Sequence, residues 1–508
     1  MADSKKILKG LFYTLGSGYV ARGASVALTF LIRHELGTDP FDATVWAVVV
    51  FALLANLSQF GLIHSLLHYQ DDVDQFSRSN FVRTHFTISL LIGIGVFLIS
   101  AATAFLIDYD GTSLGWTGTV ILTFSGLYLL RTLSVTPEAL LRKDFEHRSL
   151  SLIHGFGTIA ALAGTLWLAH TGFGAISFII GGWSTFSAYS AIYILIFTVS
   201  VWMLRPVKVW PLQLDPVWTR RILSFGVWVW LSSQLQNFVW FYDKLVMPYF
   251  VSATELSLYE NTWWLMQIPA ALITHVIMNY TVTVYAKVKD DRDKLSLVYT
   301  RALTVIVRVS APAALLLVVC AEPLVTLMGP SWAGSIPIFI WLAPYAFIRP
   351  LIEDGLGLLW SIGQTRSTAR VLAIQVLVAL IAVPASAHLW GVQGVSYAVG
   401  LTALVGGIGI MSCLRQHIDL YLFRAFGAPV LAVGVAALAA VVLHPHLQTG
   451  SLVADLISKS ALTSLVYLSI LWIAEKRYLL VMLGEIRQIM SEEEEPSGKD
   501  ESRLPVSN

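Results

Sequence analysis

Four arginines lie within apolar stretches of the sequence: Arg22, Arg131, Arg308 and Arg349. An arginine at the centre of a bilayer costs roughly 2.5–3.5 kcal/mol on insertion scales, so four unpaired ones would cost on the order of 10 kcal/mol. Because that cost is comparable with the whole stability of a protein, the four side chains must be hydrated or matched by anions. The planar guanidinium group suits bidentate contacts with phosphate, which predicts an anionic ligand such as a lipid pyrophosphate.

Arg22 lies near the middle of the first apolar run, residues 10–32. Small and polar residues recur around it at steps of three or four, which places them on one helical face: Thr14, Gly18, Ser25 and Thr29. We interpret this face as a cationic stripe that lines a substrate cavity, with the other three arginines as further substrate-binding cations. The alternative is an arginine paired structurally between helices. Arg349 could pair with Glu353, four residues along the same predicted helix.

Two further predicted helices, residues 222–246 and 256–283, carry polar stripes. Such stripes face the interior of a helix bundle, because lipid offers them no hydrogen-bond partner. Their neutral members include four candidate substrate-binding residues: Gln236, Asn237, Gln267 and His275. Three carboxylates are candidates for ion coupling or gating: Asp243, Glu260 and Glu353. Two alternatives stay open, namely helix packing for the stripes and snorkelling at the outer interface for Asp243, Lys244 and Glu260.

The composition is that of an all-α polytopic membrane protein. Of the 508 residues, 56% are hydrophobic and 13% are charged, and the mean hydropathy is +0.70, well outside the range of soluble globular proteins. Apolar windows of about 20 residues predict fourteen transmembrane helices: 10–32, 44–66, 84–106, 115–136, 150–170, 174–201, 222–246, 256–283, 299–320, 336–359, 370–389, 393–414, 425–443 and 453–473.

The positions of Lys and Arg test this count independently, because basic residues gather in the cytoplasmic loops of membrane proteins. They precede the first predicted helix and follow every even-numbered one, whereas the opposite loops hold almost only Arg33. The pattern predicts an even number of helices and places both termini in the cytoplasm, with the protein in the inner membrane. A net charge of +1 gives no sign of nucleic-acid binding, since the positions of the basic residues are explained by the orientation of the helices in the membrane.

No motif predicts catalysis, a metal or a cofactor. His64, His154 and His275 do not form metal-ligand spacings, and Cys320 and Cys413 both lie in predicted helices. A Walker-type glycine loop and a Gly-x-Ser-x-Gly nucleophile elbow are both absent from the sequence. We therefore expect neither an ATPase nor a hydrolase.

An internal repeat divides the chain. Short matches recur at a near-constant offset of 215–219 residues, among them Arg131 with Arg349 and Gly172 with Gly391. Six helices in each copy predict two parallel lobes, related by an axis along the membrane normal, with the substrate between them. The predicted segments are an N-lobe at 1–203, an interlobe linker at 204–221, a C-lobe at 222–415, two additional helices at 416–475 and a disordered cytoplasmic tail at 476–508.

Several segments carry a family resemblance: Asp290-Asp291 through Arg301-Ala302-Leu303, Ala321-Glu322-Pro323-Leu324-Val325, Trp332-Ala333-Gly334-Ser335-Ile336-Pro337, Tyr242-Asp243-Lys244-Leu245, Gln267-Ile268-Pro269 and Trp390-Gly391-Val392-Gln393-Gly394-Val395. Together they resemble the polysaccharide biosynthesis (O-antigen and exopolysaccharide) flippase family of the multidrug/oligosaccharidyl-lipid/polysaccharide exporter superfamily. The resemblance is diffuse and spans nearly all of the first twelve predicted helices.

This resemblance implies two six-helix lobes around a central cavity and transport by alternating access. The implied cargo is polyprenyl-pyrophosphate-linked oligosaccharide, moved from the cytoplasmic to the external leaflet, with Arg22 engaging the charged headgroup. Membrane lipids and other glycan-assembly membrane proteins are the implied partners, and coupling to protons or sodium is left open.

Three other functions compete with this one. Drug/cation antiporters of the same superfamily have twelve helices and often a carboxylate in helix 1, whereas this sequence has Arg22 there and fourteen predicted helices. A membrane glycan polymerase or ligase usually needs a large external loop, and the predicted external loops are short. A non-catalytic scaffold in an envelope-assembly complex would not require the buried arginines.

Overall fold

The computed structural model describes residues 23–39, 42, 44–46, 48–51, 62, 66, 75–109, 117–143, 147–174, 176–182, 190–443 and 451–494. These residues form helices and turns without a strand, which confirms the all-α class. Within the same ranges, seven helices are long and apolar enough to cross a membrane, or up to eight if one bent pair is a single span. The total of fourteen stays a prediction, because most of 10–32 and 44–66 lies outside the described residues.

Helices account for most of the described residues in both halves of the chain. Those of the first half are residues 23–36, α4 (Gln75–Tyr109), α5 (Thr117–Thr132), α6 (Val135–Lys143), α7 (His147–His170), α8 (Ile176–Gly181) and α9 (Ala191–Leu204). Those of the second half are α10 (Pro216–Val246), η3 (Met247–Tyr249), α11 (Ala253–Val288), α12 (Arg292–Val319), α13 (Ala321–Met328), η4 (Pro330–Ser335), α14 (Ile336–Ser361) and α15 (Thr365–Leu414). A separate compact unit begins at Tyr421 and contains α16 (Leu422–Leu443) and α17 (Leu452–Glu494).

Polar caps determine where three long helices of the second half begin. The Asp215 carboxylate accepts hydrogen bonds from the backbone at the start of α10, where Pro216 occupies the first position. Ser252 and Glu255 form a capping box at the start of α11, and Asp291 caps α12. These side chains satisfy backbone N–H groups that have no partner within the first helical turn.

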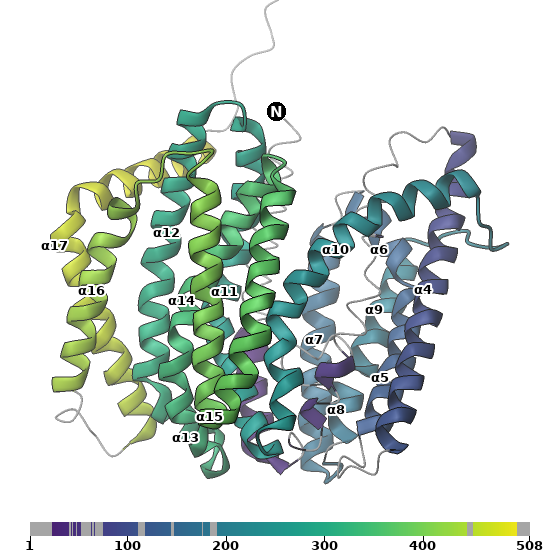
Figure 1. Ribbon diagram of the computed structural model, residues 1–508, viewed down its shortest axis with the longest axis horizontal. Coiled ribbons are helices and arrows are strands. Elements are labelled where there is room, and N and C mark those ends of the chain that lie inside the picture. Colours follow the sequence, from purple (N-terminus) through teal and green to yellow (C-terminus); the bar gives the residue numbers. More distant parts are fainter. Residues whose placement is uncertain are drawn as a thin grey trace, which may run out of the picture. The chain divides into compact units, whose positions relative to one another are not determined.

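Within the unit Met1–Leu420, α4 to α9 lie together and α11 to α15 lie together, with α10 between the two groups (Figure 1). The stretch before α10 has no regular structure and is attached to α4. There the backbone N–H groups of Gln213 and Asp215 donate to the hydroxyls of Thr87 and Thr84, at 3.2 and 3.1 Å. The six-helix lobes and their boundaries remain predictions.

Two of the predicted helices are broken. The helix predicted at 115–136 bends by 48° after Thr132 and becomes α5 and α6. The single helix predicted at 174–201 is wrong, because α8 ends at Gly181 and α9 begins at Ala191. The break starts at Gly182, whose φ of 76° is incompatible with a right-handed helix and is adopted readily by glycine alone.

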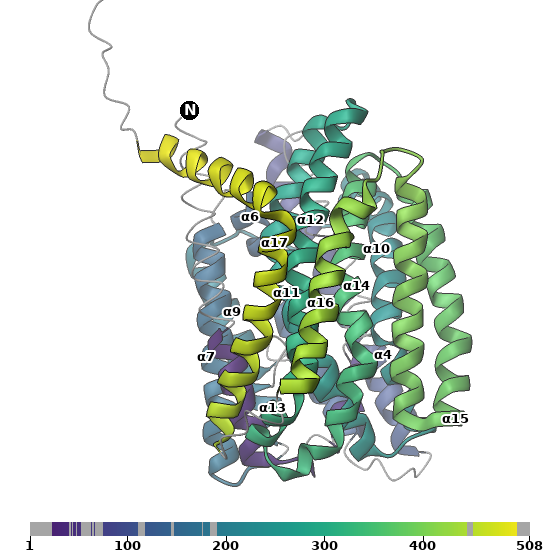
Figure 2. The ribbon, with the colours of Figure 1, turned by 90° about the vertical axis from the view of Figure 1, so that its left-hand side faces the viewer.

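The two helices predicted at 370–389 and 393–414 are confirmed as the two spans of α15. The chain reverses between them at Gly391, whose φ is 57° (Figure 2). The spans pack closely, because the Gln375 amide donates to the Thr402 carbonyl at 3.1 Å. A Cβ on Gly406 would overlap the Gln375 side chain, so only a residue without a side chain leaves room for this hydrogen bond.

The unit that begins at Tyr421 contains two spans, Leu422–Leu443 and Leu452–Lys476. After the second span α17 turns at Glu475, whose φ and ψ of −134° and 24° are not helical, and then continues as a helix to Glu494 (Figure 2). The prediction of a disordered tail is therefore wrong for residues 476–494, where good helix formers such as Leu, Met and Glu dominate. Residues 495–508 lie outside the described residues.

Large apolar side chains remain exposed along the spans. Those exposed by more than 65% include Phe105, Trp167, Leu195 and Ile381. A soluble protein would hide such side chains, whereas in a membrane they contact lipid. Their exposure agrees with a multi-pass membrane protein.

Candidate functional site

A pocket in the second half of the chain lies between α10, α14 and both spans of α15. It contains about 590 Å³ of space not filled by atoms, part of it open to solvent. The polar and aromatic lining residues are Gln236, Trp240, Asp243, Tyr345, Arg349, Glu353, Gln375 and Thr402. Four of the predicted site residues therefore meet in one place: Gln236, Asp243, Arg349 and Glu353.

Arg349 has both an anionic and an aromatic neighbour in this pocket. Its Nε donates to the Glu353 carboxylate at 2.8 Å, which confirms the pairing predicted along one helix. Its guanidinium carbon lies 4.6 Å from the centre of the Trp240 ring, a distance at which a cation is attracted to the ring face. Both ionised side chains are less than one fifth exposed, so the pair is largely shielded from water.

Tyr345 connects the pocket to α11. Its hydroxyl accepts a hydrogen bond from the Gln267 amide at 3.0 Å and another from Arg349 Nη1 at 3.3 Å. Gln267 is itself buried and is therefore a positioning residue one contact removed from the pocket. The predicted site residue Asn237 is half-buried and is not among the residues that line the pocket.

A cluster of buried charges adjoins the pocket through Asp243. Lys244 Nζ lies 4.0 Å from Asp243 Oδ2 and 3.5 Å from Glu260 Oε2, and 3.2 Å from the centre of the Trp263 ring. The Tyr259 hydroxyl donates to Asp243 at 2.5 Å. Asp243, Lys244 and Glu260 are each no more than 3% exposed, so they lie inside the protein and do not snorkel to an interface.

Arg33 is a fourth member of this charge cluster that the sequence did not identify. It is 1% exposed, interacts electrostatically with Glu260, and its guanidinium lies 4.5 Å from the Trp264 ring centre. The topology predicted from the basic residues places Arg33 in an external loop. Its isolation among loops otherwise free of basic residues was the available signal that it has a role beyond topology.

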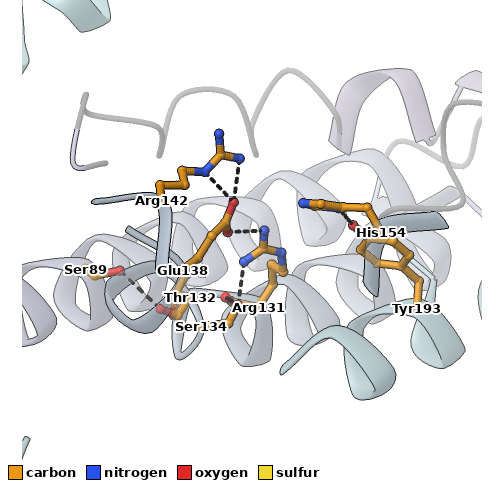
Figure 3. Close-up of polar contacts among 8 residues, drawn as sticks. All are labelled: Ser89, Arg131, Thr132, Ser134, Glu138, Arg142, His154 and Tyr193. Atoms are coloured by element: carbon orange, nitrogen blue, oxygen red, sulfur yellow. Dashed lines mark hydrogen bonds and ion pairs between the residues drawn. The ribbon is translucent and has the colours of Figure 1, made fainter. Parts of the chain in front are cut away.

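A second charged cluster lies in the first half of the chain, at the bend between α5 and α6 (Figure 3). Arg131 donates from Nη2 to Glu138 at 2.7 Å and also bonds to Ser134. Arg142 donates to the other oxygen of the same carboxylate at 2.8 Å. Glu138 is only 2% exposed, so one buried carboxylate neutralises two arginines incompletely.

His154 belongs to the surroundings of Arg131 and shows no metal-site geometry. Its Nδ1 is hydrogen-bonded to the Tyr193 hydroxyl, and its ring packs at 4.6 Å from the Phe197 ring. Arg131 lies over the same Phe197 ring at 4.1 Å (Figure 3 shows its charged partners). Among the described residues no group of three or more His, Cys, Asp or Glu side chains could hold a metal ion.

The remaining predicted residues fall elsewhere or outside the described parts. Arg308 on α12 is 8% exposed and donates to the Thr304 carbonyl of its own helix; it does not line the pocket. Arg22 lies outside the described residues, and so does the side chain of His275. The substrate-binding roles assigned to these three residues stay predictions.

Asp354 is a buried carboxylate that the sequence reading missed. It is 1% exposed and accepts hydrogen bonds from Thr281 and Tyr285 of α11, at 3.0 to 3.2 Å. Its position next to Glu353 was the available signal, because two adjacent carboxylates inside an apolar stretch are expensive.

Comparison with known proteins gives a family. The family model described as "Polysaccharide biosynthesis protein" matches residues 36–337. The lipopolysaccharide biosynthesis protein WzxC of Escherichia coli K12 is 20% identical over 350 residues, which are 69% of this chain and 68% of that protein.

Two solved structures share the fold. The lipid II flippase MurJ in an inward closed conformation aligns with a TM-score of 0.74 and 14% identity, over 91% of this chain and 98% of that one. An inward-facing multidrug resistance MATE family transporter of the MOP superfamily aligns with a TM-score of 0.56 and 15% identity, over 80% and 94%. At these identities the likeness concerns the fold alone.

Proposed function

The chain belongs to the polysaccharide biosynthesis protein family of the MOP (multidrug/oligosaccharidyl-lipid/polysaccharide) superfamily, and from this membership we propose that it flips a lipid-linked oligosaccharide. It is a multi-pass membrane protein and a flippase-like transporter. The proposed cargo is polyprenyl-pyrophosphate-linked oligosaccharide, moved from the cytoplasmic to the external leaflet by alternating access. The family match over residues 36–337 is the observation that carries the proposal.

The arginines supply the charge that such a cargo needs. Arg22 is the proposed contact to the pyrophosphate, and the pocket around Arg349 is the proposed contact to the glycan. Trp240 and Tyr345 offer flat rings, and Gln236 and Gln375 offer amide groups, a combination of apolar faces and a few polar groups that is typical of small-molecule sites. The lipid tail would remain in the bilayer.

The environment of the protein follows from the same proposal. We place it in the inner membrane with both termini in the cytoplasm, as the basic loops predict. Membrane lipids and other glycan-assembly membrane proteins are its proposed partners. The two solved structures that share its fold are a lipid II flippase and a multidrug resistance transporter, and we propose no catalytic role.

A second candidate is an ion-coupled drug/cation antiporter. The pocket favours it in one respect, since two carboxylates, Asp243 and Glu353, line it together with aromatic rings. Carboxylates and aromatic ring faces both attract an organic cation. The two candidate functions therefore differ in the charge of the ligand. A pyrophosphate is an anion and requires the cationic face of Arg22 in addition to this pocket.

Deletion of the gene in its native host tests the proposal. We expect a lipid-linked oligosaccharide to accumulate in the cytoplasmic leaflet and surface glycan to disappear, as measured by mass spectrometry of extracted lipids. Unchanged lipid-linked glycans together with increased sensitivity to organic cations would support the antiporter.

Arg22→Ala tests the role of that side chain in the same host. Surface glycan should be lost while the amount of protein in the membrane stays normal.

Arg22→Lys separates point charge from bidentate geometry, because lysine keeps the charge and loses the planar fork. Arg292→Gln is a matched control, since it removes an exposed ion pair with Asp419 and should leave export unchanged. Normal surface glycan in Arg22→Ala would refute the assigned role.

A further inference from the structure

The stretch that joins α9 to α10, residues 205–215, has no regular structure and presents an apolar edge. Its even-numbered side chains are exposed, from Pro206 to Leu214, whereas most of the odd-numbered ones are half-buried. A period of two is that of an extended chain, in which successive side chains point to opposite sides. The exposed side, which we call the linker edge, consists of Lys208, Trp210, Leu212 and Leu214.

The linker edge is held in a defined position by α4. The backbone N–H groups of Gln213 and Asp215 donate to two threonine hydroxyls of that helix. Just beyond them the Trp218 ring is buried and packs against the Phe81 ring of α4, with 4.8 Å between ring centres. The segment is therefore a fixed part of the surface rather than a slack connection, with its backbone toward α4.

The apolar side chains of this region are unusually exposed for residues outside a membrane-crossing helix. Trp210 is 76% exposed and Val217, in the first turn of α10, is 60% exposed. Leu212 and Leu214 are also among the exposed large hydrophobic residues. A contiguous exposed apolar patch marks a surface that binds a protein, a ligand or a membrane.

Lipid-exposed helix faces lead into the segment from both sides. On α9 the exposed residues Leu195, Val199 and Met203 follow one another at steps of four and so form one stripe down to the end of the helix. On α10 the exposed residues Val227 and Leu231 form a similar stripe. The chain therefore passes from one lipid-facing helix to the next through residues 205–215, which places the linker edge at the surface of the bilayer.

The same region is basic. Residues 205–221 contain four basic residues and one acidic residue, Asp215. The Asp215 carboxylate is already occupied, because it accepts hydrogen bonds from the first turn of α10. Lys208, Arg220 and Arg221 are exposed, and the Arg221 guanidinium lies 5.1 Å from the centre of the buried Trp218 ring. Positive charge thus surrounds the apolar edge.

We propose that residues 206–221 form a binding surface for anionic phospholipids of the cytoplasmic leaflet. Trp210, Leu212 and Leu214 enter the boundary between headgroups and acyl chains, where the amphipathic indole ring of tryptophan is favoured. The three exposed cations bind the lipid phosphates, since basic residues next to a membrane are attracted to anionic lipids. The choice of leaflet follows from the topology proposed above.

This surface leads directly into a helix that lines the pocket. Gln236 and Trp240 of α10 are pocket residues, and the same helix begins at Pro216 within the proposed lipid-binding surface. A phospholipid bound here therefore contacts the same helix as a ligand in the pocket, and it holds the beginning of that helix at the membrane surface.

A fluorescent label at position 212 tests the proposal in the full-length protein. L212C is placed in a chain whose two free cysteines are replaced, C320A/C413A, and the labelled protein is reconstituted in vesicles of phosphatidylcholine with a minor amount of phosphatidylglycerol. Either the phosphatidylglycerol or an equal amount of the phosphatidylcholine carries brominated acyl chains, which quench the label on contact. Quenching by the anionic lipid should be at least about threefold stronger.

Two sets of charge removals separate this surface from basic loops in general. K208Q/R220Q/R221Q should make the two lipids quench equally. K289Q/R292Q/K294Q removes the same number of exposed cations from the turn between α11 and α12 and should leave the preference unchanged. W210S should weaken quenching by both lipids, because it removes the apolar anchor.

Ionic strength gives a test that needs no charge variant. Raising NaCl from about 0.1 to about 1 M shortens the screening length from roughly 10 to roughly 3 Å. The preference for phosphatidylglycerol should disappear, while quenching by phosphatidylcholine should persist because apolar contact remains.

Three results would overturn the proposal. The first is equal quenching by the two lipids in the chain that retains all its basic residues, and the second is an unchanged preference in K208Q/R220Q/R221Q. The third is no quenching by either lipid, which would mean that the linker edge faces water and leave a cytoplasmic protein as its occupant. The vesicles contain no glycolipid, so the outcome is independent of the proposed cargo.

Discussion

Arg131 and Arg349 match each other in the two sequence repeats, yet their surroundings differ. Each is paired with a glutamate, Glu138 or Glu353, and each lies over an aromatic ring at 4.1 or 4.6 Å. Around Arg131 one carboxylate serves two arginines, whereas around Arg349 the pairing is one to one and faces a pocket. The same pair of groups therefore closes a bend in one half and lines a pocket in the other.

The path of the backbone explains the difference. The chain bends by 48° after Thr132, which brings Glu138, seven residues away, over Arg131. In α14 the helix continues, so the partner lies at the ordinary spacing of four residues. We expect the first cluster to contribute mainly to stability and the second mainly to transport.

Glu138→Gln should have the largest effect on stability. It leaves Arg131 buried without an anion, and breaking a buried ion pair by removing one partner costs about 3–5 kcal/mol. We expect a marked drop in the thermal unfolding temperature in detergent and in the amount of folded protein in the membrane. The double variant Arg131→Gln/Glu138→Gln should recover part of the loss, and no recovery would mean that the pair is not the cause.

Arg349→Ala should reduce transport with a smaller loss of stability. The pocket is partly open to solvent, so water can replace Arg349 beside the Glu353 carboxylate. We expect surface glycan in a complemented deletion strain to fall by at least about tenfold, which corresponds to 1.4 kcal/mol. Equal loss of stability in Arg349→Ala and Glu138→Gln would remove the distinction between the two clusters.

Replacing the aromatic ring next to Arg131 or Arg349 tests the difference between the two clusters more finely. Phe197→Leu and Trp240→Leu each remove a cation–π contact worth about 0.5–2 kcal/mol. The first should lower the unfolding temperature at unchanged export, and the second should weaken export more than stability. If Phe197→Leu weakened export and Trp240→Leu lowered only the unfolding temperature, the roles of the two clusters would be the reverse of those proposed.

Arg142→Gln should have the smallest effect. Its side chain is 40% exposed, and exposed ion pairs contribute about 0–1 kcal/mol. Glu138 retains Arg131 as its partner, so the unfolding temperature should change little. A drop as large as that of Glu138→Gln would show that the two arginines act as a unit.

The sequence predicted most of the long helices because each is a continuous apolar run, and it predicted the Arg349–Glu353 pair because both partners lie on one helix. It missed the pairing of Arg131 with Glu138, since that contact depends on a bend. The break at Gly182 was missed because the segment 174–201 is apolar on average despite the Ser and Thr residues that follow Gly182.

Long-range contacts explain what else the sequence did not predict. Arg33 is separated by more than 200 residues from Glu260 and Trp264, and hydropathy contains no information on which helices meet. For Asp243, Lys244 and Glu260, counting along single helices left a position at the outer interface open, whereas all three are buried and contact one another across α10 and α11. The pocket is also lined by Gln375 of α15. No pattern in the sequence indicates that this residue contributes to a site.

The burial of Arg33 has a consequence for biogenesis. Arg131 and Glu138 leave the ribosome almost together, so that pair can form as its hairpin enters the membrane. Arg33 is synthesised long before Glu260, and at 5–20 residues per second the interval is roughly 10–45 s. During that time neither Glu260 nor Trp264 exists, so a pause or truncation before residue 260 leaves Arg33 without these two contacts of the folded protein.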